Sequence, residues 1–333
     1  MKTAVVLGGG GFIGNHLVNS LKDEGYWVRA VDLKYPEYQT TRADEFIQGD
    51  LKDRSIVQKA LNSPDKHPGG LDEVYQLAAD MGGADYIFTG ENDANVMFNS
   101  AMINLNVAKE AVGFKAKRVF YSSSACMYPE YNQMDPNNPK CAETDAYPAA
   151  PDSEYGWEKL FSERLFAAFQ KNYGLKAYVG RYHNVYGPLG TWRGGREKSP
   201  AALCRKVAEI PSNILRGTID VYGDGTQTRS FLYIDDCVEA TKKFIRNDSF
   251  FGPVNIGSEE MISINDFAYL IADVAGKKID IRNIDGPTGV RGRCSHNALI
   301  EAELGWQPRY NLLDGITKLY EWIDSQVRIK EAA

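Results

Sequence analysis

The sequence has few cysteines and no long apolar run, and these absences exclude several classes of protein. Its 333 residues include only five cysteines, which are scattered and form no Cys-x-x-Cys pair. A disulfide framework or a structural zinc site is therefore disfavoured, and we expect a reducing, cytoplasmic compartment. No apolar run approaches the ~20 residues of a membrane span. We also expect no signal peptide, because the chain enters a strand pattern almost at once.

An excess of positive charge is absent as well. The formal net charge is −6, and charged residues make up 25% of the chain against 43% hydrophobic residues. These are ordinary values for a globular protein, and an acidic chain offers no general surface for nucleic acid. We therefore expect no nucleic-acid partner, no membrane association and no metal site.

A run of three serines, residues 122–124, is the most informative stretch that is present. It follows the apolar residues 118–121, which predict a buried parallel strand. Small hydroxyl residues just past the carboxyl end of such a strand are where an open α/β sheet places ligands. Cys126 follows directly and adds a potential thiolate, although a lone cysteine is more often a small packing residue.

A tyrosine and a lysine four residues apart come about thirty residues later. Tyr155 and Lys159 begin a predicted helix over residues 155–173, and the spacing puts both side chains on one helix face. With Ser124 they can converge on a substrate oxygen. We expect the ammonium to lower the pKa of the phenol, so that the phenolate of Tyr155 removes a hydroxyl proton while hydride leaves the same carbon.

A glycine-rich turn between the first predicted strand, residues 3–7, and the first helix predicts a dinucleotide site. Gly8, Gly11 and Gly14 have the spacing G-x-x-G-x-x-G, which lets the backbone approach a pyrophosphate at a helix amino terminus. Asp32 ends the second predicted strand and can accept hydrogen bonds from ribose hydroxyls. It would repel a 2′-phosphate, so NAD is favoured over NADP. The further expected cofactor contacts are Phe12, Ile13, Asp50, Leu77, Ala78 and Ala79.

The remaining pattern predicts an α/β fold, a Rossmann-type doubly wound parallel sheet with a smaller C-terminal substrate domain. We expect the NAD-binding domain over 1–180 plus about 228–258, and the sugar-nucleotide domain over about 181–227 plus 259–333. Asp235 and Asp236 are expected to cap a helix, and residues 221–225 to form a hairpin-like turn. Further strands are predicted at 46–51, 72–77, 176–180, 227–234 and 253–257, and helices at 96–112, 264–275 and 312–330.

A glycine-rich basic segment at residues 191–200 interrupts the acidic chain. A local cluster of cations suits a small anionic ligand, such as a diphosphate, better than a polymer. A solvated loop is the alternative for any single residue of the segment.

Together these motifs resemble the extended short-chain dehydrogenase/reductase family and, within it, the GDP-mannose 3,5-epimerases. The resemblance covers nearly the whole chain. It implies NAD as cofactor, a GDP-sugar as substrate, a homodimer, and conversion of GDP-mannose to GDP-L-galactose through transient oxidation at C4. The segments with the most specific resemblance are 124–129, 181–188, 194–198, 227–229 and 290–293.

The resemblance also implies roles for individual residues. Tyr155 and Lys159, with Ser124, would perform the redox step, and Cys126 and Lys198 would form the acid–base pair. The implied substrate contacts are Gly82, Ser124, Cys126, Asn184, Glu197, Lys198, Lys206, Gln227, Arg229 and Arg291.

Three alternatives remain open at this stage. A sugar-nucleotide 4,6-dehydratase shares the first hydride step but typically needs an Asp-Glu pair where this chain has Ala125-Cys126. A C4 epimerase would need no acid–base pair besides Tyr155. A non-catalytic NAD-binding regulator or RNA-associated protein would be favoured by loss of Tyr155 or Lys159, or by a broad basic face, and none of these features is present.

Overall fold

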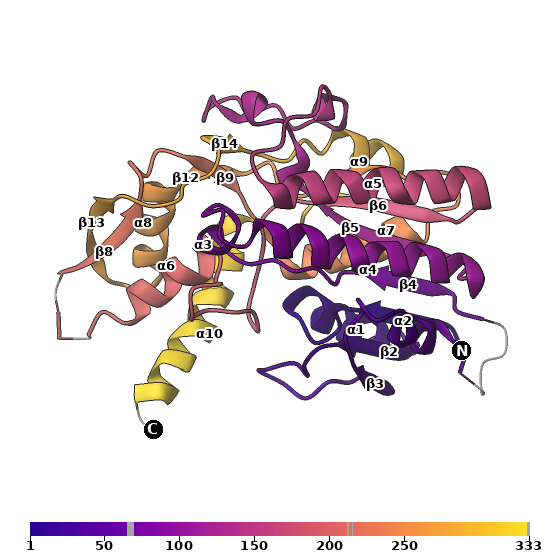
Figure 1. Cartoon of the computed structure of the whole chain (residues 1–333). Coiled ribbons are helices and arrows are strands. Elements are labelled where there is room, and N and C mark those ends of the chain that lie inside the picture. The colour runs from indigo at the N-terminus through magenta and orange to yellow at the C-terminus, as the bar shows by residue number, and fades with distance from the viewer. Residues whose placement is uncertain (65–69, 212, 215, 332–333) are drawn as a thin grey trace.

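A seven-stranded, wholly parallel sheet lies at the centre of the computed structural model, in the order β11-β6-β5-β4-β1-β2-β3 (Figure 1). The structure describes residues 1–64, 70–211, 213–214 and 216–331. The strands of the sheet are β1 (Thr3–Leu7), β2 (Trp27–Asp32), β3 (Glu45–Gln48), β4 (Glu73–Gln76), β5 (Val119–Ser124), β6 (Ala177–Tyr182) and β11 (Val254–Ile256).

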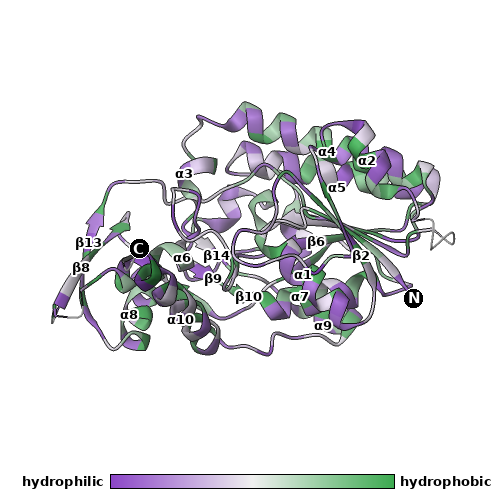
Figure 2. Cartoon of the chain, turned by 90° about the horizontal axis from the view of Figure 1, so that it is seen from below, coloured by the Kyte–Doolittle hydropathy of each residue, from purple (hydrophilic) through white to green (hydrophobic). Residues whose placement is uncertain are grey.

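Helices cover both faces of this sheet, as Figure 2 shows. Successive residues of a strand point to opposite faces, so Val5 and Leu7 belong to one buried cluster while Ala4 and Val6 belong to another. None of the described helices is long and apolar enough to cross a membrane. One face carries α2 (Arg54–Leu61), α4 (Asp93–Gly113) and α5 (Glu154–Tyr173), and the other carries α1 (Phe12–Asp23), α7 (Ile234–Ile245) and α9 (Ala298–Leu304).

A second group of elements packs beside the carboxyl-terminal edge of the sheet (Figure 1). It contains α3 (Ala84–Ile87), α6 (Ser199–Ala208), α8 (Ile264–Val274) and α10 (Leu312–Glu331), with a parallel pair β8 (Arg216–Tyr222) and β13 (Lys278–Ile284). Short strands join the two groups: β7 (Val185–Tyr186) pairs with β10 (Leu232–Tyr233), and β9 (Thr228–Ser230) lies between β12 (Met261–Ser263) and β14 (Gly292–Arg293). The division into two domains at the predicted boundaries stays a prediction.

The doubly wound parallel sheet is confirmed, and so are the elements with the clearest patterns. The first strand has the expected bounds, the tyrosine helix begins one residue earlier than expected, at Glu154, and Gly174 ends α5 in a left-handed conformation with φ 68°. The strand predicted at 253–257 is β11, which rejoins the main sheet beside β6.

The serine run is placed differently from the prediction. We expected residues 122–124 just beyond the strand, but β5 continues through Ser124 and these residues pair with Gly180, Arg181 and Tyr182 of β6. The chain leaves the sheet only in the short 3-10 helix Ala125–Met127. The strand is longer than predicted because β6 also extends to Tyr182 and supplies hydrogen-bond partners.

Three other local predictions are wrong. Residues 221–225 form no hairpin, because β8 pairs in parallel with the distant β13. The strand predicted at 227–234 is split into β9 and β10, which belong to different sheets. The cap of α7 is Tyr233, and the buried carboxylate of Asp236 instead accepts the backbone N–H groups of Arg309 and Tyr310.

A buried ion pair fastens α5 to the sheet. Arg181 of β6 donates to both carboxylate oxygens of Glu163, at 2.9 and 2.8 Å, and both side chains are almost fully buried. Glu163 also accepts the hydroxyl of Ser123. Two charges withdrawn from water depend on each other, so loss of one leaves the other uncompensated.

We predict that Arg181→Met lowers the free energy of unfolding by about 3–5 kcal/mol, because it strands the Glu163 carboxylate in the interior. Urea denaturation measures this. Adding Glu163→Gln should recover part of the loss. The matched control is Arg216→Met, which breaks a pair with Asp280 whose side chains are 56% and 57% exposed and should cost about 0–1 kcal/mol. Equal losses in Arg181→Met and Arg216→Met would contradict the prediction.

Candidate active site

The candidate site lies where the carboxyl ends of β1, β4 and β5 meet, because neighbouring parallel strands end at the same edge of a sheet. The glycine turn follows β1, residues 77–80 follow β4, and Ser124 and Cys126 stand at the end of β5. Segments far apart in the sequence are therefore neighbours.

The glycine turn forms a cradle in which side chains cannot fit. Gly8 has φ +90°, and a Cβ on it would lie 2.9 Å from the backbone nitrogen of Ala78. A Cβ on Gly14 would lie 2.1 Å from the carbonyl oxygen of Gly8, so helix α1 packs directly on the turn. Gly11 is the N-cap of α1, and the first N–H groups of a helix point outward as donors for an anion. This backbone fits the diphosphate of a dinucleotide.

Asp32 stands beside the cradle at the end of β2. Its Oδ2 accepts the backbone N–H of Gly10 at 3.0 Å, which ties the carboxylate to the glycine turn. Burial raises the pKa of Asp32, and the hydrogen bond from Gly10 opposes that shift. The placement agrees with a carboxylate that reads ribose hydroxyls, a role that remains a prediction.

The other predicted cofactor contacts border the same edge. Leu77, Ala78 and Ala79 follow β4, and the Ala78 backbone touches Gly8. Asp50 lies beyond β3 rather than within it, because that strand ends at Gln48, and its carboxylate accepts the backbone N–H of Lys52 at 2.9 Å. Phe12 and Ile13 begin α1 and are partly buried.

Helix α5 places Tyr155 and Lys159 against β5. Lys159 is 2% exposed and donates to the carbonyl oxygen of Ser122 at 2.9 Å. Its ammonium lies 5.5 Å from the centre of the Tyr155 ring, and the hydroxyl of Ser124 lies near enough to the phenol of Tyr155 to lower its pKa in part. The three side chains predicted to meet at one substrate oxygen are therefore brought together.

The electrostatics of this pair differ from the expectation. We expected Lys159 to lower the pKa of Tyr155, but burial raises the pKa of that phenol, and the charge of Cys126 adds to the rise. Burial also lowers the pKa of Lys159, which the carboxylate of Glu158 opposes. Desolvation dominates because Tyr155 is only 6% exposed. The phenol of Tyr155 therefore keeps its proton in the structure, and Tyr155 acts as a base only after that proton has been lost.

Cys126 has a cationic neighbour that the sequence did not reveal. Arg293 of β14 donates to the Cys126 sulfur at 3.0 Å, to Gln133 Oε1 at 2.6 Å and to the Asp152 carboxylate at 3.4 Å. Burial opposes the charge of Arg293, but Cys126 and Asp152 together raise its pKa above the usual value. The Cys126 sulfur is therefore held by a buried cation. No sequence pattern indicated the contact, since 167 positions separate the two residues.

Lys198 reaches the site from the basic segment as the N-cap of α6. Its side chain is exposed to solvent, yet protein atoms crowd the ammonium enough for desolvation to lower the pKa of Lys198. The charge of Cys126 opposes that lowering of the Lys198 pKa, and it opposes the lowering of the Lys159 pKa as well. Tyr155, Lys159, Cys126 and Lys198 thus share one electrostatic environment.

Several predicted substrate contacts bind other parts of the protein. Glu197 accepts from Arg205 at 3.1 Å and from the backbone of Gly195 at 2.7 Å. Lys206 donates to the carbonyl of Asp220, and Arg291 pairs with Asp224 at 3.2 Å on an exposed turn. These three side chains are therefore engaged in the structure, and their contacts with a substrate stay predictions.

The remaining predicted substrate contacts differ in whether their polar groups are already bound within the protein. Asn184 has φ 41° and donates to the Ser230 carbonyl, whereas Gly82 lies packed against Tyr86. The amide oxygen of Gln227 is buried and has no hydrogen-bond partner among the described residues, so it can serve a ligand. Burial, and then the neighbouring Arg293, lower the pKa of Arg229 to about 10.

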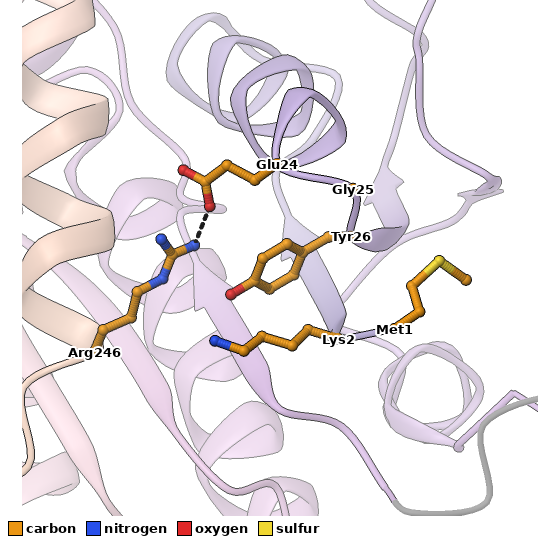
Figure 3. A pocket seen from close by; sticks show the side chains of 6 residues that line it. All are labelled: Met1, Lys2, Glu24, Gly25, Tyr26 and Arg246. Atoms are coloured by element: carbon orange, nitrogen blue, oxygen red, sulfur yellow. Dashed lines mark ion pairs between the residues drawn. The ribbon is translucent and has the colours of Figure 1, made fainter.

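A cavity of about 420 Å³ at the opposite edge of the sheet is not part of this site (Figure 3). It lies beside the amino terminus, and Arg246 at its wall pairs with Glu24 at 2.8 Å and with the buried Glu73 at 3.1 Å. Tyr26 also donates to Glu73. The charged groups there neutralise one another, so the arrangement stabilises the end of α7 against the sheet.

Comparisons with known proteins agree with this geometry. The model of the NAD dependent epimerase/dehydratase family matches residues 4–257. The GDP-mannose 3,5-epimerase of Arabidopsis thaliana is 43% identical over 329 residues, which are 98% of this chain and 83% of that protein. GDP-mannose 3,5-epimerase 1 of Oryza sativa subsp. japonica is 44% identical over 324 residues, 97% of this chain and 82% of that protein. Among solved structures, the UDP-glucuronic acid 4-epimerase of Bacillus cereus, in complex with UDP-glucuronic acid and NAD, is 25% identical with a TM-score of 0.79, and the match covers 98% of this chain and 100% of that one.

Proposed function

The chain belongs to the NAD-dependent epimerase/dehydratase family, and from that premise we propose that it is an isomerase converting GDP-mannose to GDP-L-galactose by inversion at C3 and C5. The observation that supports this most strongly is the position of Cys126. A thiol held by Arg293 stands beside the Tyr155–Lys159 pair, and neither a C4 epimerase nor a simple dehydrogenase needs it. The relatives with this activity match nearly the full length of the chain.

NAD is the cofactor that we propose, and the residues present fit it. The glycine cradle and the amino terminus of α1 would hold its diphosphate, and Asp32 its adenosine ribose. Lys159 would hold the nicotinamide ribose. Bound NAD supplies a hydride acceptor for C4 and later returns the hydride.

Tyr155 moves the proton that accompanies oxidation at C4. As a phenolate beside the hydroxyl of Ser124, Tyr155 accepts the proton of the C4 hydroxyl and returns it at the end of the cycle. Lys159 stabilises the negative charge that Tyr155 would otherwise carry alone in a buried site. Because Lys159 is anchored to the Ser122 carbonyl, the pair keeps its geometry.

Oxidation at C4 makes the protons on C3 and C5 acidic, because each then lies next to a carbonyl and its removal gives an enolate. Cys126 and Lys198 perform these transfers, one removing a proton from one face and the other supplying a proton to the opposite face. Arg293 holds the Cys126 sulfur by a hydrogen bond, and the lowered pKa of Lys198 makes its proton easier to release. Reduction at C4 then completes the cycle without net oxidation.

A homodimer is the assembly that we propose. Helices α4 and α5 lie side by side and expose large apolar side chains, with Phe98 61%, Leu105 41%, Trp157 39% and Phe161 45% exposed. Residues four or seven apart lie on one face of a helix. Phe98 and Leu105 therefore lie on one face of α4, and Trp157 and Phe161 lie on one face of α5. Apolar surface of this kind is typical of a contact with another chain.

A cytoplasmic location also stays a prediction. All five cysteines are free thiols in the structure, and the proposed chemistry needs Cys126 to remain reduced. A reducing compartment preserves such a thiol.

We predict that the protein binds NAD at least roughly 10-fold more tightly than NADP, because the 2′-phosphate would meet the like charge of Asp32. Isothermal calorimetry with both cofactors measures the ratio. Asp32→Asn should reduce the ratio of the two affinities, because the amide does not repel the 2′-phosphate and is nearly the same size as the carboxylate. Comparable affinities in the unmodified protein would rule out this role for Asp32.

We predict that Cys126→Ala slows epimerisation of GDP-mannose by roughly 10²–10⁴-fold while oxidation at C4 continues, since Tyr155 and Lys159 are untouched. Arg293→Met should show the same pattern with a smaller loss. Mass spectrometry of the 4-keto sugar and NMR of the product in deuterium oxide follow the two steps separately.

The unmodified protein should introduce deuterium at C3 and C5 and none at C4. Tyr155→Phe serves as the opposite control, because it should abolish 4-keto sugar as well as product. A product without solvent deuterium at C3 and C5 would exclude the enolate mechanism. Loss of C4 oxidation in Cys126→Ala would mean that the thiol only packs against the substrate.

We predict that Phe98→Glu combined with Phe161→Glu yields a monomer, because two charges would be buried at each copy of the interface. Sedimentation velocity measures the mass. Tyr269→Glu is the matched control, since Tyr269 is 46% exposed on α8, away from α4 and α5, and should leave the mass unchanged. A monomeric unmodified protein at micromolar concentration would contradict the proposed homodimer.

A further inference from the structure

Lys198 lies on a segment that lacks regular structure of its own. The residues from Gly190 to Lys198 belong to no helix or strand, and Gly194 and Gly195 both have positive φ. The proposed proton transfer requires the side-chain nitrogen of Lys198 to be held close to the reacting carbon and aligned with it. Something outside the segment must therefore position it.

The first external contact is with Gly83, the N-cap of α3. A Cβ on Gly83 would lie 2.4 Å from the carbonyl oxygen of Glu197. Its φ of −74° is open to any residue, so glycine is not needed here for backbone conformation. It is needed because the backbone next to Lys198 approaches α3 too closely for any side chain.

The second contact joins the same two segments through side chains. The guanidinium of Arg196 lies 4.1 Å from the centre of the Tyr86 ring, well within the range of a cation–π interaction. The hydroxyl of Tyr86 donates to Asp80 at 2.9 Å, and the other oxygen of Asp80 accepts from Asn99 at 2.8 Å. The ring is thereby fixed to α4 and to the loop after β4, and Arg196 is held against it.

We propose that Tyr86 and Gly83 of α3, acting through Arg196 and Glu197, position Lys198 for proton transfer without taking part in oxidation at C4. The inference rests on the proposed epimerase function and identifies Tyr86 and Arg196 as positioning residues. Neither has a hydrogen bond or a cation–π contact with Tyr155, Lys159 or Ser124 among the interactions of the described residues, although the Tyr86 ring packs against the apolar cluster that contains Tyr155. The polar contacts that hold Arg196 are thus separate from those that hold the Tyr155–Lys159 pair.

Arg196→Ala and Gly83→Ala test whether α3 positions Lys198, because each alters one side of the contact between α3 and the segment before Lys198. Each should lower kcat for GDP-mannose epimerisation and deuterium uptake from solvent by roughly 10–100-fold, as expected for a catalytic group displaced by about 1 Å. The 4-keto sugar should still form at the rate of the unmodified protein, and KM should change little. Tyr86→Phe keeps the ring but loses the hydrogen bond to Asp80. Its kcat and deuterium uptake should therefore fall less than those of Tyr86→Ala.

Lys318→Ala is the matched control, since Lys318 also lies over a tyrosine ring, 5.9 Å from the centre of Tyr310, and should leave every step unchanged. Thermal melting verifies that each variant is folded. Unchanged deuterium uptake in both Arg196→Ala and Gly83→Ala would overturn the inference. A raised KM with unchanged kcat in Arg196→Ala would also overturn it, because Arg196 would then act on the substrate diphosphate. An unmodified protein that introduces no deuterium would refute the proposed function itself.

Discussion

The packing of α5 against β5 is the contact on which the candidate site depends. Lys159 is buried and donates to the carbonyl of Ser122, while Arg181 and Glu163 form the ion pair that holds the same helix to β6. Gly156 lies so close to the Cys126 backbone that a Cβ would meet its carbonyl oxygen at 2.1 Å. One helix therefore places the phenol, the ammonium and the thiol relative to one another.

The desolvation that this packing causes also determines the chemistry. Burial raises the pKa of Tyr155 and lowers the pKa of Lys159, and both shifts disfavour charge in the site. Charge is allowed where it is compensated, as at Arg293, which faces Cys126 and Asp152. The site therefore shifts Tyr155 toward its protonated form and Lys159 toward its deprotonated form, so a charge formed during the cycle must be compensated by a neighbouring group.

The two proposed half-reactions draw on parts of the fold with different secondary structure. Tyr155 and Lys159 stand on a long helix packed on the central sheet, where their geometry follows from the core. Lys198 stands at the start of α6, after an irregular segment that contacts α3 through one glycine and one stacked arginine. Positioning of the acid–base pair is therefore the more sensitive of the two to changes far from the reacting atoms.

Local patterns in the sequence predicted most of the elements and the candidate reacting groups. The glycine spacing, the apolar strands and the Tyr155–Lys159 spacing depend on residues within one turn or one strand, so they can be read without the fold. The tertiary structure alone decided what faces these groups: Arg293 beside Cys126, Tyr86 beside Arg196, β13 beside β8 rather than a hairpin, and a raised rather than lowered pKa for Tyr155. These features depend on burial and on contacts between segments up to 167 positions apart, and no periodicity within a segment records which distant segment will pack against it.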